Sequence, residues 1–172
     1  MKLQIPIKDR YVHRVTWSDC SRRLKCDGFA DKENKGMECS SLLRIPAKMH
    51  NLELVFQFIN TVLKEHLESE KEQAMIRIAI EEMFVNITFY AYPDQSGWVE
   101  IIGKVEDHVA SFTLIDNGIP FNPLERPDPD VMLPAQDRQI GGLGIYMVKK
   151  RMDSVEYEYK DGCNILTLRK HV

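Results

Sequence analysis

"LIDNGIPFNP", residues 114–123, decides how the chain is interpreted, because a strand-like run ends there in an acid. Phe112 to Ile115 are apolar or favour extended structure, so they predict a β-strand that ends at Asp116. Asn117 and Gly118 account for a turn, since glycine adopts positive φ without steric cost. A carboxylate at a strand end can also accept a hydrogen bond from an amino group, and the glycine leaves room for a flat ring. A plain Asp-Gly turn is the alternative.

A second polar pair lies on the helix predicted over residues 71–92. This helix is apolar on most faces and contains "EEMFVN" at 81–86. Glu82 and Asn86 are four residues apart, so their side chains share one face. They either lie at the solvent edge, where most glutamates are found, or face a ligand, because a buried carboxylate needs partners.

A glycine-rich stretch, "GGLG" at 141–144, precedes another predicted helix. Glycines at a helix start expose backbone N–H groups and the positive end of the helix dipole, which suits a phosphate. No Gly-Lys-Ser/Thr follows, so the stretch is not a Walker loop, and a flexible hinge is the alternative. The 25 residues 117–141, which run into this stretch, hold five prolines and no periodic pattern. Such a long loop indicates either a wrong element assignment or a functional lid, which would span 119–140.

The other elements complete a two-layer arrangement. We expect a helix over 51–67 with Asn51 as its N-cap, and strands at 41–46, 98–116 (a hairpin turning near Glu106), 154–160 and 163–170. This order predicts an α+β fold, a two-layer α/β sandwich with helices on one face of a mixed, mostly antiparallel sheet. Residues 1–39, with nine Lys or Arg against six Asp or Glu, form an N-terminal extension to a domain spanning 40–172, either ordered or a flexible arm. Its stretch "SRRLKCDGFADKENKG" is polar and turn-rich, whereas "LQIPI" and "YVHRVTW" could each be a short strand.

Composition narrows the class of protein. The chain has 172 residues, 44% hydrophobic and 28% charged, which is typical of one globular domain. Its net charge of −3 gives no electrostatic reason to expect nucleic acid or an anionic membrane as a partner. No apolar run approaches the roughly 20 residues of a membrane span and no signal peptide is evident, so we expect a cytoplasmic protein. The cysteines match no common zinc pattern and are expected to be thiols: Cys20, Cys26, Cys39 and Cys163.

Taken together and in this order, the three motifs resemble the Bergerat ATP-binding fold of the GHKL superfamily (gyrase, heat-shock protein 90, histidine kinases and MutL). "EEMFVNITFYAYPD", "DNGIPFNP" and "GGLGIYMVKKRMDSVEY" look like its N, G1 and G2 boxes. The resemblance covers roughly residues 40 to 170. The small size and the lack of a histidine-bearing dimerisation helix point to one bacterial branch, the anti-sigma factor serine/threonine kinases.

The resemblance implies roles for the motif residues. Asn86 would bind Mg²⁺ through its side-chain oxygen, and Glu82 would be the general base for the attacking hydroxyl or water. Asp116 would accept the adenine amino group, with Gly118 letting the base approach. The lid would close over the nucleotide. Phosphate contacts would come from residues around the start of the last helix: Arg138, Gly141, Gly142, Leu143 and Gly144.

The function implied by this resemblance is that of an ATP- and Mg²⁺-dependent protein kinase. It would phosphorylate a serine on a STAS-type anti-anti-sigma partner and bind a sigma factor in competition with that partner. Members of the branch often carry His where this chain has Tyr90, next to Phe89, and Tyr is not cationic near neutral pH. Two alternatives follow: a nucleotide-dependent binding module with little transferase activity, and a detached histidine-kinase-like catalytic domain. The strand starting at Ser40 could pair across a homodimer edge.

Overall fold

The fold is built on one six-stranded sheet with the strand order β1-β2-β3-β4-β6-β5. The computed structural model describes residues 12–15, 40–64, 66–93, 95–129 and 143–172. Within these residues every strand pairing is antiparallel, so the expected mixed sheet contains only antiparallel pairs there. The strands are β1 (Val12–Val15), β2 (Ser40–Pro46), β3 (Trp98–Glu106), β4 (Val109–Asp116), β5 (Ser154–Lys160) and β6 (Cys163–His171).

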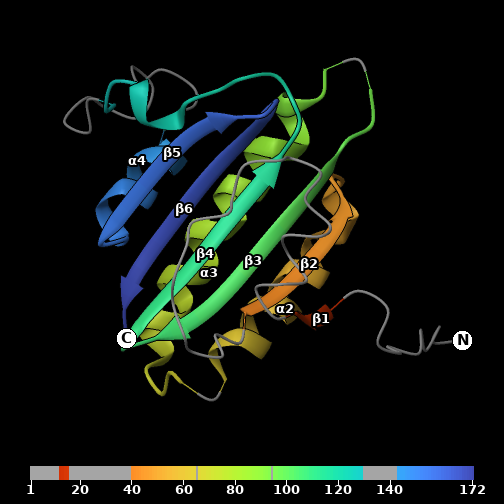
Figure 1. Cartoon of the computed structure of the whole chain (residues 1–172). Coiled ribbons are helices and arrows are strands. Elements are labelled where there is room, and N and C mark those ends of the chain that lie inside the picture. Colours follow the sequence, from red (N-terminus) through yellow and green to blue (C-terminus); the bar gives the residue numbers. More distant parts are fainter. Residues whose placement is uncertain (1–11, 16–39, 65, 94, 130–142) are drawn as a thin grey trace, which may run out of the picture.

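The helices form the second layer. Figure 1 shows α2, α3 and α4 together behind the sheet, while its other face is turned to the viewer. The α+β two-layer prediction is confirmed. The helical segments are α2 (Leu52–Leu63), α3 (Glu70–Asn86), a π-helical turn η2 (Ile87–Ala91), α4 (Leu143–Arg151), and the short 3-10 segments η1 (Met49–Asn51) and η3 (Pro123–Glu125).

The core lies between the two layers. Along β4, Ala110, Phe112 and Leu114 are buried and alternate with more exposed positions, as expected for a strand with one face against helices. Phe112 of β4, Phe58 of α2 and Phe84 of α3 belong to one hydrophobic cluster, and all three rings are fully buried. This cluster fixes α3 across the sheet, and the position of α3 decides where its polar residues point.

Turn chemistry closes the central hairpin where the sequence predicts it. Asp107 and His108 connect β3 to β4, and both have positive φ, at 47° and 60°. Such two-residue turns match the right-handed twist of the flanking strands. The β5–β6 hairpin turns at Asp161 and Gly162, which also have positive φ.

Two helix ends differ from expectation. Asn51 makes no N-cap hydrogen bond to α2, and its Nδ2 donates to the Pro46 carbonyl at 2.9 Å, which ties the helix start to the end of β2. The helix predicted over 71–92 is α-helical only to Asn86 and then widens into η2. Its N-cap is Ser69, whose Oγ accepts from Glu72 N. π-Helical turns of this kind occur frequently at functional sites.

The edge of β2 is occupied by the chain itself. β1 pairs with β2 in antiparallel register, from Val12 opposite Leu43 to Val15 opposite Ser40. The backbone of Ser40 to Leu43, through which a dimer contact was expected, thus pairs within the chain, and a homodimer stays a prediction. No helix in the described part of the chain has the length and hydrophobicity of a membrane span. Cys163 is a buried thiol, and the other three cysteines lie outside the described residues.

The phenylalanine cluster yields a stability prediction. Phe112→Ala should lower the free energy of unfolding by about 3–5 kcal/mol, because it removes a fully buried ring and leaves a cavity. Urea denaturation followed by circular dichroism measures this change. The matched control is Phe89→Ala, the same truncation at a ring that is 61% exposed, which should change stability by less than about 1 kcal/mol. Equal losses in the two variants would contradict the assignment of Phe112 to the core.

Candidate functional site

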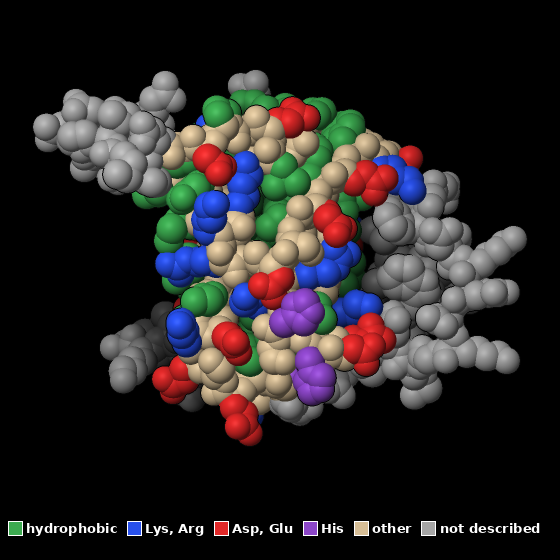
Figure 2. Space-filling model, turned by 90° about the vertical axis from the view of Figure 1, so that its left-hand side faces the viewer, with side chains coloured by type: hydrophobic (Ala, Val, Ile, Leu, Met, Phe, Trp, Pro, Cys, Tyr) green, Lys and Arg blue, Asp and Glu red, His purple; other side chains and the backbone are tan. Residues whose placement is uncertain are grey.

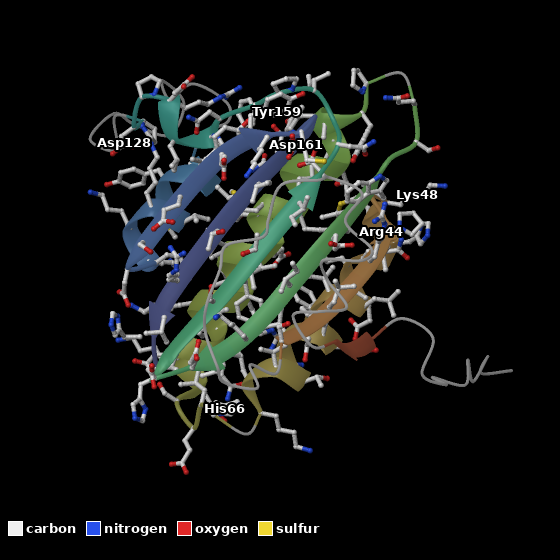
Figure 3. The ribbon with its side chains drawn as sticks, viewed as in Figure 1. Arg44, Lys48, His66, Asp128, Tyr159 and Asp161 are labelled. Carbon is white, nitrogen blue, oxygen red and sulfur yellow. The ribbon has the colours of Figure 1, made fainter. Side chains whose placement is uncertain are left out.

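A cavity of about 650 Å³ opens at the end of the sheet where β4 stops and β6 begins. Side chains from α3, η2, β4, β5, β6 and the start of α4 line it, so it lies between the helix layer and the sheet. In Figure 3 the β5–β6 turn, marked by Tyr159 and Asp161, is at this upper end of the molecule, and His66 lies at the opposite end. The volume suits a ligand of nucleotide size.

Asp116 lies in the cavity wall and is 4% exposed. Its Oδ1 accepts two hydrogen bonds, from Gly118 N and from Asn164 Nδ2, both at 2.9 Å. No described residue donates to Oδ2, which leaves this oxygen to a ligand. Burial raises the pKa of the Asp116 carboxyl above its ordinary value, while the two hydrogen bonds act in the opposite direction. The buried acid is thus an acceptor aimed into the cavity.

Asn164, opposite Asp116 in the β4–β6 register, is a site residue that sequence analysis missed. It follows a hairpin turn in "DGCN", so it resembles an ordinary turn residue. Its role appears only when β6 pairs with β4, and that long-range register is not visible in local sequence. Tyr157 of β5 also lines the cavity and donates from its hydroxyl to Asn164 Oδ1 at 2.7 Å.

Tyr92 fixes the turn after β4 from the other side. Its hydroxyl lies 2.6 Å from the Trp98 carbonyl and 2.9 Å from Asn117 Oδ1, and it accepts from Asn117 N at 3.1 Å. Burial raises the pKa of Tyr92 to about 12, with Asp116 adding to the effect, so the hydroxyl keeps its proton at neutral pH. The residues after η2 therefore hold the Asp-Asn-Gly turn in place.

The structure brings Glu82 and Asn86 together on the cavity side of α3, both half-buried. Their half-buried position on the cavity wall is compatible with both sequence interpretations, a place at the solvent edge and a place facing a ligand. Gly144 of α4 comes so close that a Cβ there would overlap the Glu82 carboxylate. This glycine thus leaves room for the Glu82 carboxylate, which a larger residue would displace. Leu143 also lines the cavity, whereas Arg138, Gly141 and Gly142 lie outside the described residues.

Gly118 is not among the residues that line the cavity. The structure gives another reason why a glycine stands at this position. A Cβ at this position would come within 2.5 Å of the Ala91 carbonyl oxygen. The adjacent Ile119 N donates to this same oxygen at 3.0 Å. The glycine therefore permits the end of η2 to pack against the turn after β4, and it orders Asp116 through its own N–H.

Positive charge near the cavity comes from Arg126. Its side chain lines the wall, with the guanidinium 5.3 Å from the centre of the Phe121 ring. Lys149 of α4 holds this segment: its ammonium reaches the Leu124 and Arg126 carbonyls at 3.3 and 3.1 Å and Asp128 Oδ1 at 3.3 Å. Figure 3 shows Asp128 on the α4 side of the molecule.

The surface on the α4 and β5 side carries charges of both signs. Lys and Arg side chains are interspersed there with Asp and Glu side chains (Figure 2).

Comparison with known proteins agrees with this geometry. The family described as "Histidine kinase-like ATPase domain" matches residues 45–170. Similar curated proteins are serine-protein kinases RsbW. The relative from Bacillus thuringiensis is 25% identical over 128 residues, and one from Bacillus cereus is 27% identical over 129; each alignment covers 72% of this chain and 80% of the relative. The predicted resemblance to ATP-binding domains of the histidine-kinase-like type and to serine-protein kinases is confirmed by the family match and by these relatives.

A solved structure supports the fold. The chain resembles a crystal structure of the RsbU and RsbW domains of a Mycobacterium tuberculosis protein, with a TM-score of 0.53 and 18% identity. The match covers 76% of this chain and 32% of the other, so this chain spans about a third of that protein. At this identity the likeness concerns the fold alone.

The buried carboxyl yields a prediction about stability. Because the folded-state pKa of Asp116 is raised, its contribution to stability is complete below the unfolded pKa and is lost as pH rises through the folded value. Ionised Asp116 therefore costs stability at pH 7, and Asp116→Asn, whose Oδ1 can accept the same two hydrogen bonds, should be at least as stable as the wild type there. The difference in free energy of unfolding between Asp116→Asn and the wild type should become smaller as pH falls toward 5, because Asp116 then becomes protonated.

Urea denaturation at pH 7 and pH 5 measures this difference. The matched control is Asp161→Asn on the β5–β6 turn, an exposed acid at positive φ, a conformation that Asn also tolerates. This control should follow the wild type at both pH values. A less stable Asp116→Asn at pH 7 would show that hydrogen bonding outweighs desolvation at this carboxyl.

Proposed function

Because the chain belongs to the family of histidine kinase-like ATPase domains, we propose that it binds ATP with Mg²⁺ in the described cavity and transfers the γ-phosphoryl group to a serine of a protein partner. The observation that carries the proposal is the convergence of Asp116 Oδ2, Glu82 and Asn86 on one cavity. An acceptor at one end and a carboxylate–amide pair on α3 supply the chemistry that a nucleotide and its phosphates need. Residues 40–172 form the catalytic unit in this proposal, and residues 1–39 are an extension that adds β1 to the sheet.

The site's oxygen donors fit a magnesium ion. Mg²⁺ binds hard oxygen ligands and keeps several waters, using one or two protein groups together with substrate phosphates. Asn86 offers a side-chain oxygen on the cavity wall next to Glu82. No group of three or more His, Cys, Asp or Glu gathers as a metal cage in the part of the chain that the structure describes, so a phosphate-shared ion suits the site better. When bound, the ion would neutralise charge on the phosphates.

Glu82 is the proposed general base. Its carboxylate takes the proton of the serine hydroxyl while the serine oxygen forms a bond to the γ-phosphorus and the bond to the β,γ-bridging oxygen breaks, releasing ADP. Gly144 and the start of α4 supply the space and N–H groups for the phosphates, together with Gly141, Gly142 and Arg138. Asp116 accepts from the adenine amino group through Oδ2, as Oδ1 is already occupied.

The relatives' printed name supports the serine as the acceptor of the phosphoryl group, because the aligned proteins are named serine-protein kinase RsbW. We propose that the serine lies on a STAS-type anti-anti-sigma protein and that a sigma factor binds in competition with this partner, as the resemblance of the three sequence motifs implies. Since a sigma factor acts inside the cell, the proposal places this protein in the cytoplasm. Tyr90, 69% exposed at the cavity wall, favours a second candidate, a nucleotide-dependent binding module, because it brings no cation to the site.

The proposal predicts how ATP binds. Calorimetric titration with ATP and Mg²⁺ should show binding to the wild type and about 10- to 150-fold weaker binding to Asp116→Asn, since a hydrogen bond to a charged group is lost and an NH₂ group faces the adenine amino group. Asp161→Asn is the control and should bind as the wild type does. Failure of the wild-type protein to bind ATP would refute both the kinase and the nucleotide-dependent module.

Glu82→Gln should separate the kinase from the binding module. The amide keeps the shape but cannot accept the hydroxyl proton, so transfer of labelled γ-phosphate to a STAS-domain protein should fall by about 10²- to 10⁴-fold while ATP affinity stays within about threefold. The neighbouring Glu81→Gln, which lies outside the cavity wall, should leave transfer unchanged. Equal transfer by both variants would contradict the role of Glu82. Loss of the transferred label in acid would indicate phosphohistidine and a histidine-kinase-like domain.

A further inference from the structure

The side chain of Asn164 uses its complete hydrogen-bonding capacity although it is only 6% exposed. Its Nδ2 donates to Asp116 Oδ1 at 2.9 Å and to the Ile119 carbonyl at 3.0 Å. Its Oδ1 accepts from Phe121 N at 3.0 Å and from the Tyr157 hydroxyl at 2.7 Å. Two acceptors face the NH₂ group and two donors face the oxygen, so the amide has one orientation only.

These four bonds join β4, the turn after it and β5 at the Asp116 end of the cavity. Two of them hold the turn after β4 by its backbone, at Ile119 and Phe121, and the third holds Tyr157 of β5. All three of these residues line the cavity. The fourth bond goes to Asp116, whose Oδ1 also accepts from Gly118 N. Asn164 therefore shapes this end of the cavity, and its hydrogen bond to Asp116 opposes the effect of burial on that carboxyl.

The bond to Asp116 has a consequence for recognition. With Oδ1 accepting two hydrogen bonds, the carboxyl cannot turn, and Oδ2 is the oxygen left for a ligand. Donors on Oδ1 also favour the ionised form over the protonated acid. An ionised carboxylate accepts hydrogen bonds and donates none, so it attracts a ring amino group and repels a ring carbonyl.

We propose that Asn164 is the positioning residue that makes this site select a 6-aminopurine nucleotide over a 6-oxopurine nucleotide. The inference rests on the proposed ATP binding and deepens it. Removal of Asn164 would free one lone pair of Oδ1 and weaken the preference for the carboxylate. The protonated acid could then donate to a 6-oxo group, and discrimination between the two purine classes would fall.

The test compares ATP with inosine triphosphate (ITP), which carries the same ribose and phosphates but a 6-oxo group. Calorimetric titration in the presence of Mg²⁺ gives both affinities for each variant. The wild type should prefer ATP by at least about tenfold, because a buried polar group matched to one substrate rejects its mismatch. In Asn164→Ala the ATP affinity should fall by about tenfold or more, while the ITP affinity stays level or rises.

The matched control is Asn51→Ala, which also removes a buried asparagine with a hydrogen bond to a backbone carbonyl but lies outside the cavity wall. Its ATP-to-ITP ratio should equal that of the wild type. If Asn164→Ala weakens ATP and ITP equally, Asn164 has a structural role only and the inference fails. If the wild type binds neither nucleotide, the proposed function itself fails. An unchanged ratio in a folded Asn164→Ala also overturns the inference.

Asn164→Asp tests the same idea if the alanine variant does not fold. This variant sets two carboxyl groups against each other, and they can hydrogen bond only when they share a proton. Its ATP affinity should therefore rise as pH falls from 8 to 6. Tyr92 and Tyr157, which face Asp116 from neighbouring elements, have raised pKa values and stay neutral in this range. The same pH dependence in the wild type, or none in Asn164→Asp, would contradict the inference.

Discussion

The hydrogen bond from Asn164 Nδ2 to Asp116 Oδ1 is the interaction on which the site depends. It joins β4 to β6 at the point where β4 ends, and it places an ionisable group in a buried position that would otherwise be costly. Burial and hydrogen bonding act on the acid in opposite directions, and burial dominates. As a result the Asp116 carboxyl is held through Oδ1, and among the described residues none donates to Oδ2.

Helix α3 serves the core and the site with different faces. Phe84 is fully buried in the core between the layers, while Glu82 and Asn86 of the same helix line the cavity. The helix then widens into η2, which carries Tyr90 to the cavity wall and ends at Ala91. The Ala91 carbonyl accepts from Ile119 N, so the backbone of α3 and η2 is connected directly to the turn after β4.

At two positions a neighbouring group lies so close to the backbone that a side chain would collide with it, which explains the glycine there without reference to a ligand. Gly118 admits the Ala91 carbonyl, and Gly144 admits the Glu82 carboxylate. In the first case the neighbour is backbone and cannot move aside, while in the second it is the flexible end of a side chain. Gly118 lets the end of η2 pack against the sheet end, whereas Gly144 lies between α4 and α3 within the helix layer. The site depends on the first contact because its groups come from both layers.

The sequence by itself determined the two-layer α+β fold, the hairpin of β3 and β4, and the three motifs that carry Glu82, Asn86, Asp116 and Gly144. These follow from local periodicity, turn chemistry and order along the chain, which need no long-range contact. Only the tertiary structure decided that Asn164 faces Asp116, that Tyr92 and Gly118 hold the turn, and that β1 occupies the edge of β2. Strand register and close backbone approach join residues far apart in sequence, so no local pattern contains them.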